Sequence, residues 1–407
     1  MDLERKLEVL ASSAKYDVCA PSCGGSRQTV WHQKPGRLGR VESLPITHAV
    51  LPDGRTVSLF KVLQSNACER SCFYCANRAQ ANCPRTTFQP EELSRLFFEF
   101  YRRNYVEGLF LSSGIVRSPD YTMELMLRTV ELLRTRYQFA GYVHLKTLPG
   151  ASPHLIERAG DLADRTSVNL EAPRQEHLTT IAPEKRLTEH VLEPMRVIRR
   201  VQSAGHFPAG MTTQLVVGAA EETDREILAS IDWLYRNLGL RRAYYSAFSP
   251  VPGTPLESRP PTPLVREHRL YQSDWLLKFY GFRFEELPFE RSGNLPLDAD
   301  PKQAWAGLHP ELFPVEVNSA ALEQLLRVPG IGPRSARRIC SARSERKLHS
   351  LSELGNMGAV VKRARNFLTL SGRFFPATVQ ERPKQLALFQ GMAAKSGSAV
   401  KPEGGKG

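Results

Sequence analysis

No run of about 18 consecutive apolar residues, the length that spans a bilayer, occurs anywhere in the 407 residues. The first 17 residues are charged, have a helical period and lack the apolar core of a secretory signal. Cysteine is scarce, with seven residues, and structural disulfides belong mainly to oxidising compartments. We therefore expect a cytoplasmic protein without membrane contact, whose clustered cysteines are metal ligands or reactive thiols.

Three of the seven cysteines lie in the stretch NACERSCFYCANR, where Cys68, Cys72 and Cys75 have the spacing Cys-x3-Cys-x2-Cys. Structural zinc usually takes four protein ligands, commonly as two pairs, and no second Cys-x2-Cys pair is present. A [4Fe–4S] cluster normally takes four thiolates, so three would leave one iron open to a non-protein ligand. A three-thiolate site for another metal remains the alternative.

This motif resembles that of the radical SAM superfamily, in which the same spacing holds a [4Fe–4S] cluster whose open iron chelates S-adenosylmethionine. Tyr74 strengthens the resemblance, because the family usually carries an aromatic residue there, near the adenine. The resemblance implies a partial (β/α)6 barrel. It also implies that a reduced cluster cleaves the cofactor to a 5'-deoxyadenosyl radical, with an electron donor such as flavodoxin or ferredoxin.

The surrounding chain has the pattern of an α/β fold. The stretch HAVLPDGRTVSLFKVLQ predicts a hairpin turned at Asp53-Gly54, and its second arm ends just before the cysteine loop. Residues 90–104 place apolar side chains at helical spacing. Further strand-like runs alternate with helical patterns, so six strands and their helical connections are expected. The runs are 106–113, 141–147, 166–172, 210–218 and 242–249, and the helical patterns are near 121–136, 153–162, 186–204 and 222–237.

Residues at the strand ends are the expected contacts to the cofactor, because loops converge at the carboxyl ends of parallel strands. The second strand ends in a segment that resembles the family's contact to the methionyl amino group, although the family's glutamate is absent. The fourth strand ends where the family binds the ribose, with ordinary turn polarity as the alternative. The fifth resembles an adenine-contacting segment. The expected contacts are Ser112, Ser113 and Gly114 at the second strand, Asn169 and Glu171 at the fourth, and Val217 and Gly218 at the fifth.

Acidic residues are scarce near the C-terminus. Residues 317–372 carry 10 Lys and Arg against 3 Asp and Glu, and residues 373–407 carry 6 against 2. These two segments supply most of the net charge of +13, so the barrel is nearly neutral. A basic block in a separate unit indicates a polyanionic partner.

The stretch LEQLLRVPGIGPRSARRI resembles a helix-hairpin-helix DNA-binding motif. Its glycines allow a close backbone approach, the start of its second helix offers N–H groups to a phosphate, and its central isoleucine is expected to dock in the hairpin core. Residues 351–367 hold another Gly-x2-Gly turn before a basic helix, which is either a degenerate partner hairpin or a packing helix. The expected DNA-binding residues are Gly330, Ile331, Gly332, Arg334, Arg337 and Arg338.

The C-terminal tail is rich in Gly, Ser, Lys and Pro, which predicts a flexible extension. It contains one apolar island, QLALF. Gln385, Leu386, Leu388 and Phe389 of this island resemble the peptide with which bacterial polymerases and repair proteins bind the replication sliding clamp. A chance match, or packing of the island onto the barrel, is the alternative.

These patterns predict a partial TIM-like barrel followed by a small all-α helix-hairpin-helix domain and a flexible tail. From residue 1 to 372 the chain resembles a bacterial radical SAM group associated with DNA modification or repair. An RNA-modifying enzyme of the superfamily and a noncatalytic iron–sulfur redox sensor that binds DNA remain alternatives. Cys19 and Cys23 could form a second ligand pair. The predicted segments are 1–56 (N-terminal extension and hairpin), 57–290 (barrel), 291–316 (linker), 317–372 (helix-hairpin-helix domain) and 373–407 (tail with clamp-like motif).

Overall fold

The computed structural model describes residues 1–14, 46–50 and 56–375. The chain divides into two compact units, and the boundary falls between Thr262 and Pro263. Within the described part, no helix is both long enough and apolar enough to cross a membrane. Four features expected from the sequence lie outside the described residues: the Cys19 and Cys23 pair, the Asp53-Gly54 turn, the QLALF island and most of the tail.

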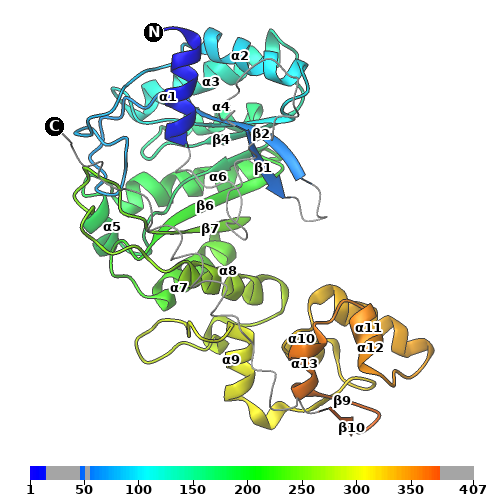
Figure 1. The fold of residues 1–407 in the computed structure, drawn as a ribbon. Helices are drawn as coiled ribbons and strands as arrows, with labels where there is room; N and C mark the ends of the chain where they lie inside the picture. The colour runs from blue at the N-terminus through cyan, green and yellow to red at the C-terminus, as the bar shows by residue number, and fades with distance from the viewer. Residues whose placement is uncertain (15–45, 51–55, 376–407) are drawn as a thin grey trace, which may run out of the picture. The chain divides into compact units, whose positions relative to one another are not determined.

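The first unit contains a curled sheet of seven strands in the order β1-β2-β3-β4-β5-β6-β7. Several of its strands are labelled in Figure 1, among them β2, β4 and β6. β1 is antiparallel to β2, and all the following pairs are parallel. Sequential order and parallel pairing fit a partial TIM-like barrel of six strands preceded by a hairpin. The strands are β1 (Ile46–Val50), β2 (Thr56–Leu63), β3 (Gly108–Ser112), β4 (Tyr142–Lys146), β5 (Arg165–Ser167), β6 (Gly210–Val217) and β7 (Arg242–Ala247).

Helices connect successive parallel strands, and each of the main connecting helices contacts the next along the sheet. Side-chain caps fix where helices begin; the Ser118 hydroxyl, for example, accepts the N–H of Tyr121 (3.0 Å) at the start of α3. The helices of this unit are α1 (Leu3–Ser13), α2 (Pro90–Arg102), α3 (Pro119–Thr135), α4 (Pro153–Leu162), α5 (Gln175–Ile181), the π-helical turn η2 (Leu187–Leu192), α6 (Glu193–Ser203) and α7 (Asp224–Leu238).

The second unit is mainly helical and has its own apolar core, which includes Leu325, Ile331, Ile339 and Leu354. It contains α8 (Leu264–Phe279), η3 (Phe284–Glu286), α9 (Pro301–Leu308), η4 (Pro310–Leu312), β8 (Val315–Glu316), α10 (Leu322–Arg327), α11 (Pro333–Glu345), α12 (Leu351–Asn356), α13 (Val361–Ala364), η5 (Arg365–Phe367), β9 (Leu368–Leu370) and β10 (Arg373–Phe374).

The expected strands and helices of the barrel are present close to their predicted positions, but the second unit is not all-α. A small sheet in the order β10-β9-β8 closes it. Leu368 and Leu370 of β9 are buried on either side of the half-buried Thr369, which is the alternation of a strand. The run is only three residues long, and of its two partners β10 has two residues and β8 is distant in sequence, so the pattern was too short to predict.

Candidate functional site

The three cysteines of the expected cluster motif lie in the loop after β2, at the carboxyl end of the parallel strands. Backbone N–H groups donate to two of the sulfurs: Ile115 to Cys68 Sγ (3.4 Å) and Asn77 to Cys75 Sγ (3.4 Å). Hydrogen bonds of this kind stabilise the sulfurs of iron–sulfur sites. Burial raises the pKa of the Cys72 thiol and raises that of Cys75 to about 12. A bound metal would therefore supply the positive charge that makes these groups thiolates.

The donor set at this site consists of three thiols from one loop, Cys68, Cys72 and Cys75. Among the described residues, one group of three His, Cys or acidic side chains brings its ligand atoms within 4.8 Å of one another, and it contains no cysteine. Three thiolates would leave one iron of a [4Fe–4S] cluster open to a non-protein ligand. The donor set therefore fits a multi-iron cluster with three protein ligands.

Gly114 follows β3 where the cysteine loop crosses its end. A Cβ at this position would lie 2.8 Å from the Cβ of Cys68, a separation that real Cβ atoms essentially never show. The Gly114 N–H also donates to the Ser65 carbonyl (2.7 Å), which fixes the start of the loop. Gly114 is therefore required by a close backbone approach, whatever contact it makes to a cofactor.

The two serines before Gly114 differ in their surroundings. The Ser113 hydroxyl contacts the Gly114 carbonyl at 2.7 Å. The Ser112 hydroxyl is buried and has no hydrogen-bond partner within the described part of the chain. A buried hydroxyl without a partner is unfavourable, so Ser112 is the better placed of the two to bind a polar group at the end of β3.

A loop at the end of α5 holds the cysteine loop from the other side. Phe73 N–H donates to the Ile181 carbonyl (2.8 Å), and Ser71 N–H donates to the Glu184 carboxylate (3.2 Å). These bonds lie on either side of the second cysteine. The loop therefore fixes the middle of the motif, while Gly114 and its neighbour fix the start.

A buried charge network lies beside the cysteines. Lys185 Nζ is 3.0 Å from Glu171 Oε1, and both side chains are buried. Burial raises the pKa of Tyr74 well above its ordinary value. Burial alone would lower the pKa of Lys185, but Glu171 and the thiols of Cys72 and Cys75 raise it above its ordinary value. Lys185 therefore places a permanent positive charge next to the cluster site.

The expected cofactor residues on β5 and β6 lie at neighbouring strand ends, since Glu171 bridges to Leu215 of β6. Asn169 is buried. Gly218 has a φ of +84°, and its N–H donates to the Glu222 carboxylate, which also accepts the Ala220 N–H (3.0 Å). The buried Glu222 therefore fixes the turn.

Val217, at the end of β6, is fully buried. Its carbonyl accepts the Phe248 N–H (2.9 Å) and the Thr262 hydroxyl (2.8 Å). These bonds tie the end of β6 to the segment after β7. The Val217 carbonyl is therefore occupied by bonds within the protein.

In the second unit, the expected hairpin is a tight turn between α10 and α11. Gly330 has a φ of +85°, which favours glycine, and Ile331 at the tip is 1% exposed in the core of the unit. Burying such a side chain contributes about 1.5–3 kcal/mol. Arg334, Arg337 and Arg338 are exposed on α11. The turn is thus packed inward, while three positive charges face solvent.

The turn before α13 repeats this arrangement. Gly358 has a φ of +90°, and Gly358 and Ala364 have the same spacing as Gly330 and Ala336. The Val360 N–H donates to the Gly330 carbonyl (2.8 Å), and a Cβ on Gly330 would lie 2.5 Å from the Val360 carbonyl oxygen. The two turns therefore pack backbone against backbone. Gly332, the N-cap of α11, completes the first turn.

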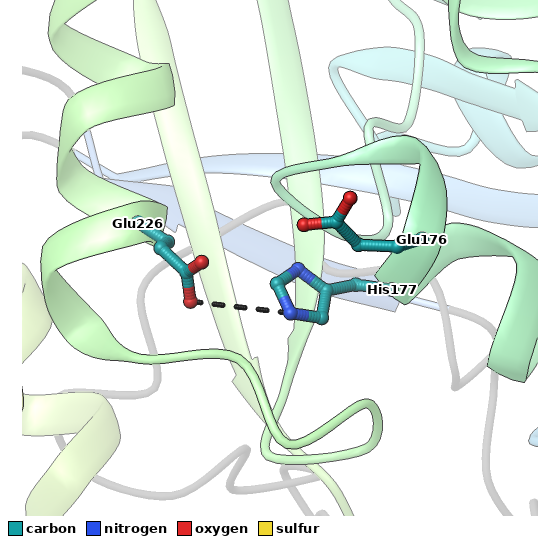
Figure 2. A group of neighbouring side chains, drawn as sticks. All are labelled: Glu176, His177 and Glu226. Carbon is teal, nitrogen blue, oxygen red and sulfur yellow. Dashed lines mark ion pairs between the residues drawn. The ribbon is translucent and has the colours of Figure 1, made fainter.

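The group that does bring its ligand atoms together consists of Glu176 and His177 on α5 and Glu226 on α7 (Figure 2). His177 Nε2 is 3.9 Å from a Glu226 oxygen. Arg174 pairs with both carboxylates at 3.4 Å, and Glu226 also accepts the Thr223 N–H at the start of α7. The Arg174 guanidinium already pairs with both acids, so the group is an ion cluster that joins α5 to α7.

Three residues around the site were missed by the sequence analysis: the exposed Glu184 and the buried Lys185 and Glu222. Their contacts reach the cysteine loop, the segment after β5 and the turn after β6. Only Glu222 carried a usable signal, because it follows a strand-ending glycine by four residues. The other two lie in a segment without a clear strand or helix period.

Comparison with known proteins finds one family model that matches part of the first unit. Residues 62–234 match the family model of the Radical SAM superfamily. No curated protein matches the chain. The FeFe-hydrogenase maturase HydG from Carboxydothermus hydrogenoformans is similar at 14% identity over 53% of this chain and 50% of its own, with a TM-score of 0.43. The radical S-adenosylmethionine methyltransferase TsrM from Kitasatospora setae is similar at 12% identity over 51% and 38%, with a TM-score of 0.38.

The chain spans about half the length of the HydG structures that it matches. The family match covers β3 to β6 and includes all three cysteines. Residues 62–234 of this chain match the radical SAM superfamily domain, the domain of enzymes whose cofactors are a [4Fe–4S] cluster and S-adenosylmethionine.

Proposed function

We propose that this protein is a radical SAM enzyme that acts on DNA, with the chemistry in the first unit and DNA binding in the second. The observation that carries the proposal is the pair of packed glycine turns followed by exposed arginines on α11. A compact basic surface beside tightly folded backbone suits the phosphates of a nucleic acid. The excess of positive charge after residue 316 supports the same partner.

Three protein ligands would hold the cluster: Cys68, Cys72 and Cys75. When bound, the cluster supplies the electron that cleaves S-adenosylmethionine to a 5'-deoxyadenosyl radical, which can abstract hydrogen from a nucleotide. The chain orients this site with the Gly114 approach on one side and the loop of Glu184 on the other. The proposed cofactor contacts lie near the carboxyl ends of the same parallel strands. They are Tyr74, Ser112, Asn169 and Gly218.

Two packed turns favour the interpretation of residues 351–367 as a partner hairpin rather than a packing helix. Phosphate contacts from such a unit would position the protein without reading the base sequence, so binding should be nonspecific and sensitive to salt. A base inside a duplex is hidden from a radical formed in a protein pocket. The target would therefore be flipped out or single-stranded when it reacts.

The decisive experiment is mass spectrometry of DNA nucleosides after anaerobic incubation with reconstituted enzyme, S-adenosylmethionine and a strong reductant. A nucleoside that appears or disappears with the wild type, and not with Cys68→Ala, would support the proposal. Duplex DNA and transfer RNA would also compete for binding. Preference for transfer RNA, together with a changed RNA nucleoside, would replace DNA by RNA as the substrate.

We also propose that the QLALF island, outside the described residues, docks on the replication sliding clamp. The glutamine would bond a pocket edge and the leucines and phenylalanine would fill apolar pockets. An exposed apolar island gains free energy from a partner that buries it. Such a tether would keep the enzyme at the nucleoid through effective concentration rather than intrinsic affinity.

A further inference from the structure

The first turn of α9 contacts the first glycine turn of the second unit and the helix that follows the second glycine turn. Lys302 is 6% exposed, and its Nζ donates to the Ile331 carbonyl at the tip of the first turn (2.6 Å). Asp300 is 3% exposed, caps the start of α9 and pairs with Arg363 of α13. One short segment therefore reaches the tip of the first hairpin and the helix that follows the second.

Lys302 is enclosed on the side away from the turn. Its ammonium lies over the ring of Tyr280, 4.7 Å from the ring centre, and the Tyr280 hydroxyl approaches Gly332. A cation over an aromatic face is stabilised when it is shielded from water. The ammonium is therefore held between an aromatic ring and a single backbone carbonyl.

Because the peptide is planar, the hydrogen bond from Lys302 to the Ile331 carbonyl also orients the N–H of the next residue. In a planar trans peptide, the carbonyl of one residue and the N–H of the next point in opposite directions. A bond from Lys302 to the Ile331 carbonyl therefore turns the Gly332 N–H away from Lys302. Gly332 is the N-cap of α11, a helix of 13 residues, so this N–H lies at the positive end of the helix dipole.

We propose that Lys302 is a positioning residue for phosphate binding, which fixes the Ile331–Gly332 peptide so that the Gly332 N–H faces a DNA phosphate. The proposal rests on the proposed function of the second unit in DNA binding. Lys302 itself does not touch the phosphate in this arrangement. It acts through one backbone peptide, and its removal would loosen the turn without exposing a new charge at the surface.

The titration of Lys302 predicts a pH dependence of DNA affinity, which a purely structural role would not give. Burial lowers the pKa of Lys302 to about 7, with Asp300 acting to raise it. A phosphate bound at the same turn would favour the charged lysine, so binding would take up a proton at neutral pH. Affinity should then fall as the pH rises above about 7. The charged or titratable groups around Lys302 are Asp300, Arg363, Arg327 and Tyr280, with Arg269 and His268 beside Asp300.

Hydrogen–deuterium exchange of the full-length protein tests the positioning role without DNA. Lys302→Met removes the donor but keeps the length of the side chain. Peptides that cover residues 328–333 and 357–361 should exchange at least about tenfold faster in this variant, as expected for loss of a hydrogen bond from a charged donor. The control Lys347→Met removes an exposed charge from the same unit and should leave these peptides unchanged.

Duplex binding by the same proteins tests the phosphate contact. Lys302→Met should weaken affinity by about tenfold at pH 6.5. Wild-type affinity should fall between pH 7 and 8.5, whereas Lys302→Arg, which keeps the donor and does not titrate, should bind equally well at both. The Arg variant keeps the test valid if the Met variant does not fold.

Wild-type exchange rates in residues 328–333 of a folded Lys302→Met would overturn the positioning role, whether or not the protein binds DNA. If duplex affinity depended on pH identically in the wild type and in Lys302→Arg, the link between Lys302 and phosphate binding would be overturned. Suppose that residues 328–333 exchange faster in Lys302→Met but the wild type does not bind duplex DNA. That result would support the positioning role of Lys302 and would contradict only the proposed DNA binding.

Discussion

Gly114 carries a size constraint that can be tested at the level of one methyl group. In Gly114→Ala, the new Cβ would lie 2.8 Å from the Cβ of Cys68, so the loop must shift. Overpacking of this kind costs about 1–3 kcal/mol. We expect anaerobically reconstituted Gly114→Ala to retain less than about half of the wild-type iron, because that cost acts on the cluster-holding conformation.

Iron and sulfide analysis with the visible absorbance spectrum would measure this loss. Gly307→Ala is the matched control, since a Cβ there meets nothing within 4 Å. Wild-type iron content in Gly114→Ala would show that the close approach does not constrain the cluster loop.

Lys185 is the second residue with a measurable role, because its charge lies beside the cluster cysteines. Adding an electron to a cluster is easier near a positive charge. Lys185→Met should therefore lower the midpoint potential, by about 60 mV or more if the effect reaches tenfold in a one-electron equilibrium. Electron paramagnetic resonance during a redox titration measures this directly.

Lys185→Arg is the control for charge, and it should keep a potential closer to the wild type. Loss of Lys185 also leaves the buried Glu171 without its ion-pair partner. Thermal unfolding of the two variants would separate that structural cost from the change in potential. Equal potentials in the wild type and Lys185→Met would refute the electrostatic role.

At the scale of the elements, what could be predicted from the sequence depended on how local each signal is. The strand β3 is a run of five buried residues, and α11 starts at the proline after a glycine turn, so both were predicted. The contact of Glu184 with Ser71 joins residues 113 positions apart, and no local period reports it. The peptide bond held by Lys302 was missed for the same reason.

The helix α11 supplies a direct test of DNA binding. Changing both Arg334 and Arg338 to glutamate should weaken duplex affinity by more than tenfold and reduce the slope of log affinity against log salt by about 2. Each lost phosphate contact removes roughly one unit of that slope. Fluorescence anisotropy over a range of salt concentrations and on two unrelated sequences would measure both quantities.

The matched control changes Arg102 and Arg103 to glutamate, since these residues are exposed at the C-terminal end of α2 in the first unit and give the same change in net charge. The control should bind nearly as the wild type does. If the two double variants lost affinity equally, binding would follow net charge rather than the hairpin surface, and α11 would lose its assigned role.

At the scale of the whole molecule, the two units predict that binding and cofactor chemistry can be separated. All three cysteines and the expected cofactor contacts lie before Thr262, and the arginine-bearing turn lies after it. The double variant at Arg334 and Arg338 should therefore produce 5'-deoxyadenosine without DNA at close to the wild-type rate. A parallel loss of this uncoupled reaction would indicate that the second unit is needed to form the cofactor site.

The QLALF island, outside the described residues, is the proposed clamp-binding peptide of this protein. A peptide of residues 381–392 should bind the sliding clamp weakly, and changing Leu388 and Phe389 to alanine should abolish binding because both anchors are lost. Calorimetry at high micromolar concentration measures this. On DNA loaded with the clamp, the full-length protein should bind more tightly than on bare DNA, since the second contact becomes intramolecular. A wild-type peptide without detectable binding, together with no gain on clamp-loaded DNA, would leave the island without this partner.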